Sequence, residues 1–125
     1  MNTGKKAEEF VRKYFEMNGI ILTKAGKGDL GYDFRNATGD FFVEVKGTAA
    51  KDIVKVLFRY FTNTEYEKAR SCRKAKQKYE IHLIVDINSS SPVHYVIPGT
   101  LLLESGKPEV TWSLPIRKEF QKYKI

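Results

Sequence analysis

Residues 31–46 read GYDFRNATGDFFVEVK, and this stretch decides the predicted fold. Two runs rich in aromatic and β-branched residues flank the polar segment 37–40, which is typical of a β-hairpin with a four-residue loop. In that register residues 33 and 44 are direct partners, so Asp33, Glu44 and Lys46 share one face. The opposite face collects the apolar side chains of Tyr32, Phe34, Phe41, Val43 and Val45. The apolar pattern therefore supports the register independently.

The sequence on either side of the hairpin alternates between helical and strand patterns. Helices are predicted at 4–18, capped by Thr3, and at 63–79, where Tyr79 completes an inner stripe. Strands are predicted at 20–23, 53–61, 80–87 and 93–99, with a strand at 109–115 and a short helix at 116–123. We therefore expect an α/β (α+β) fold with a mixed central sheet flanked by helices. A single domain is predicted over 1–125, with a core at 4–97 and a C-terminal extension at 98–125.

The composition bounds the class of protein. The 125 residues include 22 Lys and Arg against 15 Asp and Glu, a net charge of +7 that favours a polyanionic partner, nucleic acid first. Cys72 is the single cysteine, which excludes an internal disulfide and a cysteine-based zinc site. No apolar run is long enough to span a membrane, and residues 1–10 carry charge where a signal peptide is apolar. We expect an intracellular, cytoplasmic protein with no membrane partner.

The paired carboxylates on the hairpin need a physical reason. Side chains that are direct partners have Cβ atoms about 4.5–5.5 Å apart, and like charges there are destabilising. A divalent cation supplies one reason, because Mg²⁺ binds through one or two carboxylates and keeps several waters. Lys46 then adds a positive charge beside the ion. The alternative is a solvated face with two crossing ion pairs, Asp33 with Lys46 and Glu44 with Arg35.

At this point the pattern resembles the PD-(D/E)XK nuclease superfamily. The matching residues are Gly31-Tyr32-Asp33 followed by Glu44-Val45-Lys46, preceded by Gly4-x-x-Ala7-Glu8 at the start of an amphipathic helix and followed by Phe61-Thr62-x-x-Glu65. The resemblance covers residues 4–87 and is greatest to small restriction-endonuclease-like and Holliday-resolvase-like domains. Tyr32 replaces the proline of the family name. The resemblance implies a restriction-endonuclease-like αβββ(β)αβ core.

The resemblance also implies an activity. The chain would be a metal-dependent nuclease, most simply an endonuclease, that hydrolyses DNA phosphodiester bonds with an activated water. Asp33, Glu44, Lys46 and Glu8 would form the catalytic set, and Asp33, Glu44 and the Val45 carbonyl would bind Mg²⁺ or Mn²⁺. Lys46 would orient or deprotonate the attacking water. Since many relatives dimerise, a homodimer or a larger DNA-processing or defence complex is implied.

Basic residues of the second predicted helix give a candidate contact to nucleic acid. Arg70, Arg73 and Lys74 form a patch suited to phosphates, although basic residues near a helix C-terminus are also typical of a solvated face. Two other functions stay open. One is a non-catalytic nucleic-acid-binding or assembly module with the same fold, and the other is a plain α/β structural domain with an ion-paired hairpin.

Three further residues have structural explanations. Glu65 is the acidic member of a capping box with Thr62, which explains it without chemistry and leaves its place in the site open. His82 and His94 have no histidine or cysteine at metal-ligand spacing. Both are therefore interpreted as hydrogen-bonded structural residues.

Overall fold

The hairpin forms with the predicted register. β2 (Phe34–Arg35) pairs antiparallel with β3 (Phe41–Gly47), and Phe34 lies opposite Val43. The Asn36 N–H donates to the Phe41 carbonyl at 3.1 Å, which closes the loop at residues 37–40, as predicted. The computed structural model describes residues 2–28, 30–51, 61–105, 107–108, 112–113 and 118–125.

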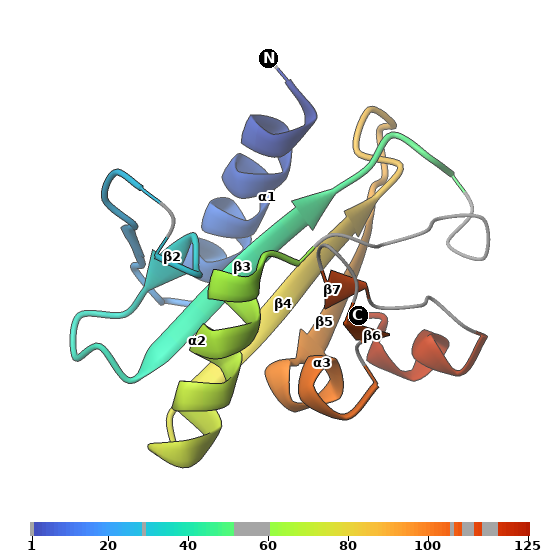
Figure 1. Ribbon diagram of the computed structural model, residues 1–125. Helices are drawn as coiled ribbons and strands as arrows, with labels where there is room; N and C mark the ends of the chain where they lie inside the picture. The colour runs from blue at the N-terminus through green and yellow to red at the C-terminus, as the bar shows by residue number, and fades with distance from the viewer. Residues whose placement is uncertain (1, 29, 52–60, 106, 109–111, 114–117) are drawn as a thin grey trace.

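The hairpin is part of a five-stranded mixed sheet with the order β1-β2-β3-β4-β5 (Figure 1). β3 and β4 (Lys78–Val85) are parallel, which requires a crossover between them, and α2 (Asn63–Lys74) lies in that crossover. β1 (Thr23–Lys24) and β5 (Val93–Pro98) pair antiparallel with β2 and β4. The predicted α/β (α+β) class with a mixed sheet is confirmed.

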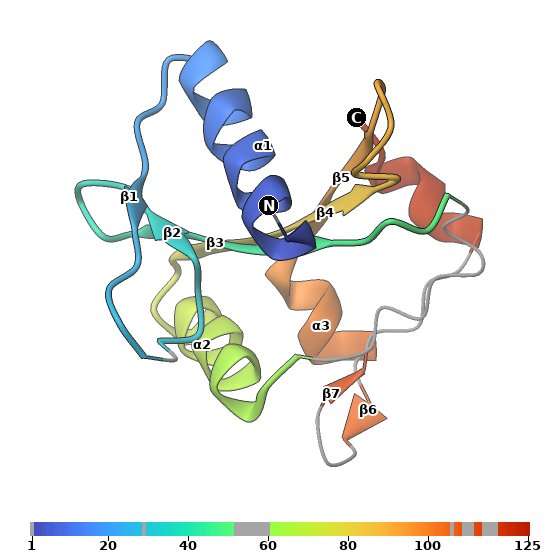
Figure 2. The ribbon, with the colours of Figure 1, turned by 90° about the horizontal axis from the view of Figure 1, so that it is seen from above.

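Helices cover both faces of this sheet, as Figure 2 shows. α1 (Thr3–Met17) lies on one face, and α2 lies with α3 (Gly99–Ser105) on the other. The C-terminal segment adds β6 (Lys107–Pro108), which pairs with β7 (Trp112–Ser113), and the 3₁₀-helix η2 (Lys118–Tyr123). In the described part of the chain no helix is long and apolar enough to cross a membrane.

Each face of the sheet carries its own apolar core. Under α1 the buried residues are Ala7, Val11, Phe15, Leu22, Phe34, Val43, Val45, Ile84 and Ile87. Under α2 and α3 they include Phe42, Phe61, Ala69, Cys72, Tyr79, Ile81, Leu83, Val85, Tyr95, Ile97 and Leu102. β4 contributes to both sets because it is a central strand covered on both faces, as its continuous apolar run predicts.

Gly47 brings the start of α1 close to the end of β3. A Cβ atom at Gly47 would lie 2.6 Å from the Ala7 Cβ and 3.2 Å from the Thr3 carbonyl oxygen, so no larger residue fits without moving the helix. Since Glu8 follows Ala7 directly, this close approach also fixes the height of Glu8 above the sheet.

The second predicted helix is shorter than expected. α2 ends at Lys74, and Lys76 adopts a positive φ of 59° that reverses the chain into β4. Tyr79 therefore belongs to a strand, not to the inner stripe of the helix. The apolar spacing that suggested a helix over 63–79 arises from two elements. α2 packs on one face of the sheet, and Tyr79 of β4 contributes to the same apolar core.

Several smaller expectations were wrong. Asn2, not Thr3, caps α1, and its side chain accepts from the Lys5 N–H at 2.8 Å. Met17, assigned to the apolar stripe, is 87% exposed. Of the strand predicted at 20–23, only Thr23 lies in a strand, the two-residue β1, and α3 was not predicted.

Other predicted elements fall wholly or partly outside the described residues. Of the strand predicted at 53–61, only Phe61 is described, and it is buried. β7 lies within the predicted strand 109–115, and η2 lies within the predicted helix 116–123, of which 116–117 are outside the described residues.

Candidate active site

Asp33 lies immediately before β2 and is held against β3 by two hydrogen bonds. Its N–H donates to the Val43 carbonyl at 2.8 Å, and its Oδ2 accepts from the Val45 N–H at 2.7 Å. Burial raises the pKa of Asp33 above its ordinary value, while the bond from Val45 acts in the opposite direction. The negative charge of Glu8 raises this pKa further, so Glu8 lies within electrostatic reach of Asp33.

Glu44 is a buried carboxylate in the middle of β3, on the face covered by α2. Only 4% of the residue is exposed, and burial raises its pKa well above the ordinary value. Lys46 lowers this pKa, whereas the negative charges of Asp33 and Glu65 raise it. The positive charge of Lys46 therefore compensates the acidic cluster only in part.

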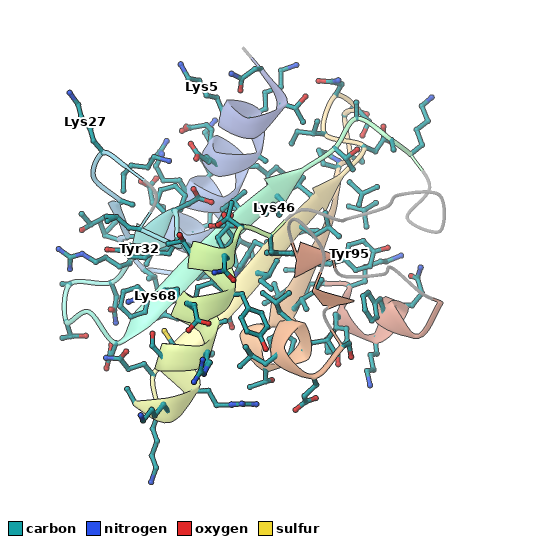
Figure 3. The ribbon with its side chains drawn as sticks, in the orientation of Figure 1. Lys5, Lys27, Tyr32, Lys46, Lys68 and Tyr95 are labelled. Carbon is teal, nitrogen blue, oxygen red and sulfur yellow. The ribbon has the colours of Figure 1, made fainter. Side chains whose placement is uncertain are left out.

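The side chain of Lys46 extends from β3 toward the first turn of α2; Figure 3 labels this residue. Its Nζ is 3.1 Å from Glu44 Oε2 and 3.1 Å from Glu65 Oε1, and it lies 5.0 Å from the centre of the Phe61 ring. Burial lowers the pKa of Lys46, but the two carboxylates outweigh burial and raise it above its ordinary value. The Lys46 side chain is therefore an ammonium at neutral pH.

The alternative of a solvated, cross-paired hairpin face does not describe this arrangement. Glu44 is buried, and Lys46 pairs with Glu44 and Glu65 rather than with Asp33. The Arg35 guanidinium donates to the Asn36 carbonyl at 3.2 Å instead of pairing with Glu44. The carboxylates at this point of the chain thus form an inward-facing cluster.

Glu8 approaches the same place from α1, across the edge of the sheet. Its Oε1 lies 2.5 Å from the Nζ of Lys24, on β1. Both residues line an open groove of about 370 Å³ together with Lys5, Glu9, Arg12 and Phe34. The sequence predicted the place of Glu8 on the helix but not Lys24, which comes close because Lys24 pairs with Phe34 in the sheet.

Tyr79 is a further residue of the site that sequence reasoning missed. Burial raises the pKa of Tyr79 well above its ordinary value. The negative charges of Glu44, Glu65 and Asp33 raise it further. Its hydroxyl donates to the Gly31 carbonyl at 2.7 Å, which ties β4 to the segment that carries Asp33. Gly31 has a φ of 83°, and a Cβ there would lie 2.7 Å from the Thr64 carbonyl oxygen, so this position requires glycine.

Tyr32 lies on the opposite face from the one expected. Its ring contacts Phe42 at a centroid distance of 4.8 Å, and the Lys68 ammonium lies 5.3 Å from the ring. Tyr32 and Lys68 are labelled in Figure 3. The regular alternation of side chains ends at Asp33, before β2 begins, because the positive φ of Gly31 turns the chain there. Tyr32 therefore packs beneath α2 instead of with Phe34 under α1.

One protein-family model matches a segment of the chain that spans this whole arrangement. Residues 4–96 match the family model described as Protein NO VEIN, C-terminal. The chain belongs to this family. The matched segment contains every residue of the acidic cluster, from Glu8 in α1 to Glu65 in α2, together with Lys46 and Tyr79. Comparison with curated proteins finds no significant match.

The basic patch expected to contact nucleic acid lies away from the cluster. Arg70, Arg73 and Lys74 are exposed on the second half of α2. Glu65 is in the first turn, so Lys74 lies about 13 Å further along the helix axis at 1.5 Å per residue. Arg70 is also 3.4 Å from Glu67. The structure thus does not bring these three residues to the carboxylates.

The two histidines are hydrogen-bonded, as predicted, and both are buried. His82 Nδ1 is 2.8 Å from His94 Nε2, and His82 Nε2 is 3.0 Å from Glu80 Oε1. Burial, followed by the neighbouring His82, lowers the pKa of His94 to about 3. Aromatic rings of α1 enclose them, with Tyr14 at 4.7 Å from His94 between ring centroids.

The donor set of the cluster fits a hard divalent cation. Burial raises the pKa values of Asp33 and Glu44, and a cation bound between them would favour their ionised forms. In a strand the N–H and C=O of one residue point to the same edge, so the Val45 carbonyl faces the Asp33 side of β3. Within the described residues no three His, Cys, Asp or Glu side chains are arranged to hold a metal. An ion here would therefore depend on two carboxylates, the backbone and water.

Proposed function

We propose that this chain is a Mg²⁺-dependent deoxyribonuclease of the PD-(D/E)XK type, with a restriction-endonuclease-like fold. The observation that carries the proposal is the carboxylate pair of half-buried Asp33 and buried Glu44, with the Lys46 ammonium 3.1 Å from Glu44. An acidic pair sheltered from solvent beside a fixed cation is costly for a protein to maintain, and such perturbed groups cluster at functional sites.

Asp33, Glu44 and the Val45 carbonyl would hold Mg²⁺ or Mn²⁺. When bound, the ion supplies a water of lowered pKa and positive charge beside the phosphate oxygens. Asp33 is already oriented for this by the Val45 N–H, and Glu44 by Lys46. Because each carboxylate already has a fixed partner on β3, little reorganisation is needed on binding.

Lys46 would act as a charged hydrogen-bond donor. An ammonium with a raised pKa donates to a phosphate oxygen or to the attacking water, and it stabilises the charge that develops in an in-line displacement. This narrows the role expected from the resemblance, in which Lys46 orients or deprotonates the water. Glu8, close to Asp33, would accept from a water in the open groove beside α1.

DNA is the proposed substrate because of the basic balance of +7 and the acidic catalytic cluster. Arg70, Arg73 and Lys74 would contact the backbone at a distance from the cut. A homodimer or a larger DNA-processing or defence complex would supply additional contacts to a domain of this size.

Cleavage assays test the proposal directly. Plasmid, linear duplex and branched DNA are incubated with Mg²⁺, Mn²⁺ or EDTA, using wild type, Asp33→Asn, Lys46→Ala and Asp40→Asn. Asp40 is the control, because it is an exposed carboxylate in the loop of the same hairpin. We expect metal-dependent cutting that falls about a hundredfold or more in the first two variants and persists in the third.

Two other results would contradict the nuclease proposal. Salt-sensitive DNA binding by the wild type without turnover favours the non-catalytic binding module. Cutting that is equal in wild type and Lys46→Ala means that the activity does not come from this site. Circular dichroism of each variant shows that the fold is retained.

A further inference from the structure

Glu65 makes two different sets of contacts with one carboxylate. Its Oε1 accepts from the Thr62 N–H at 3.0 Å, which completes the capping box at the start of α2. The same oxygen is 3.1 Å from Lys46 Nζ, and Oε2 is 3.5 Å from it. The residue is only 8% exposed. Glu65 thus joins the helix terminus to the lysine of the candidate site.

Helix capping by itself does not require a charged residue at position 65. Glutamine serves equally well at the third position of a capping box, because its amide oxygen accepts the same backbone N–H. Only a carboxylate adds a negative charge beside Lys46, and here that charge also raises the pKa of the neighbouring Glu44. The acidic side chain therefore has an electrostatic disadvantage that capping does not explain.

Neutralisation of Lys46 does not explain Glu65 either. Glu44 already lies 3.1 Å from the ammonium and balances its charge. A lysine ammonium has three donors on a flexible stem. Two carboxylates on separate elements, β3 and α2, occupy two of these donors and so set the direction of the third.

We propose that Glu65 is a positioning residue, which fixes the Lys46 ammonium so that its third N–H points to the scissile phosphate group beside Asp33 and Glu44. This inference rests on the proposed nuclease function and states how that site is held in order. It also gives α2 a role in the site, since its first turn carries the Glu65 carboxylate.

The test separates the charge of Glu65 from its capping role. Glu65→Gln retains an acceptor for the Thr62 N–H but removes the charge beside Lys46. Thr62→Ala is the matched control, because it removes the side-chain half of the capping box, in which Thr62 Oγ1 accepts from the Glu65 N–H at 3.1 Å. This control leaves both Glu65 oxygens and their contact with Lys46 in place.

The first readout needs neither metal nor substrate. In ¹H–¹⁵N spectra that select lysine ammonium groups, a hydrogen-bonded and ordered Lys46 gives a cross-peak protected from solvent exchange, assigned with Lys46→Arg. We expect this cross-peak in wild type and Thr62→Ala and its loss in Glu65→Gln. A cross-peak that persists unchanged in Glu65→Gln overturns the proposal, whatever the nuclease assays show.

The second readout is steady-state cleavage of DNA. We expect Glu65→Gln to lower kcat about ten- to a hundredfold with KM within about twofold of wild type, as is common when a supporting partner is lost. Thr62→Ala should keep its kcat. Equal kcat in wild type and Glu65→Gln overturns the positioning role. If the wild type itself cuts no DNA, the nuclease proposal fails, whereas loss of the Lys46 cross-peak in Glu65→Gln still supports the holding of Lys46 by Glu65.

Discussion

Glu44 illustrates, at the scale of one residue, how a candidate active site opposes stability. Its pKa is raised on folding, so the folded state favours the protonated form. At neutral pH the burial of this group therefore costs stability, and the cost shrinks as the pH falls toward the ordinary pKa of 4.5. The Lys46 ion pair offsets only part of the burial.

Glu44→Gln is accordingly expected to stabilise the metal-free protein. Glutamine keeps an acceptor for Lys46, and Glu65 still balances the ammonium charge. We expect the free energy of unfolding at pH 7 to rise by about 1–2 kcal/mol, the scale of replacing an imperfectly compensated buried charge. Urea denaturation in EDTA measures this change.

The pH dependence of that difference provides the control. The gain from Glu44→Gln should shrink as the pH is lowered toward 4.5, because the unfolded wild-type chain then also binds a proton at Glu44 and the cost of burying its charge disappears. Asp40→Asn should give no gain, since hydrogen bonds from Asn36 and Thr38 lower the pKa of Asp40 in the folded state. A loss of stability in Glu44→Gln at pH 7 would contradict this account of the cluster.

At the scale of elements, the position of α1 on the sheet depends on Gly47. The Cβ positions of residues 7 and 47 would be 2.6 Å apart if residue 47 carried a side chain. α1 carries Glu8 one residue further on, so a shift of this helix moves Glu8 relative to Asp33. The packing of one glycine therefore connects the fold to the geometry of the site.

Gly47→Ala is expected to destabilise the protein by about 1–3 kcal/mol, because the added methyl group overpacks the contact between α1 and β3. Thermal and urea denaturation measure the loss. Gly26→Ala is the matched control, since a Cβ there meets nothing within 4 Å and the backbone has no positive φ. Equal stability of the two variants would show that α1 is not held at this contact.

At the scale of the whole molecule, the buried histidine pair links α1, β4 and β5 and makes folding sensitive to acid. Folding lowers the pKa of His94 to about 3 from an ordinary value near 6.5. Below pH 6.5 the unfolded chain thus binds a proton that the folded chain excludes. The free energy of unfolding therefore decreases as the pH is lowered. Glu80 on β4 acts in the same direction, because its pKa is lowered by folding; Asp33 and Glu44 act in the opposite one.

The comparison of wild type with His94→Gln isolates this contribution. Glutamine places an amide nitrogen near the position of the imidazole Nε2 but does not titrate. Between pH 6.5 and 4, we expect wild type to lose up to about 1.4 kcal/mol per pH unit more than the variant. Urea denaturation across this range gives both slopes. Parallel slopes would mean that His94 is not held neutral in the folded protein.

The hairpin and the first helix are predictable from sequence because their signals are local. Alternating apolar residues and a loop of fixed length set the register that pairs Phe34 with Val43. Helical spacing and the Asn18-Gly19 stop place α1 within a residue of its observed bounds. In contrast, the boundary of α2 was misplaced, since the periodic signal of 63–79 runs across the turn at Lys76 into β4.

The sequence by itself determined which residues carry the candidate chemistry, because Asp33, Glu44 and Lys46 lie on one hairpin and their spacing follows from strand geometry. Only the tertiary structure decided their partners. Lys46 meets Glu65 because the parallel pairing of β3 and β4 requires a crossover, and α2, which carries Glu65, lies in that crossover and packs on the Glu44 face. Such contacts join residues far apart in the chain, so no local pattern encodes them.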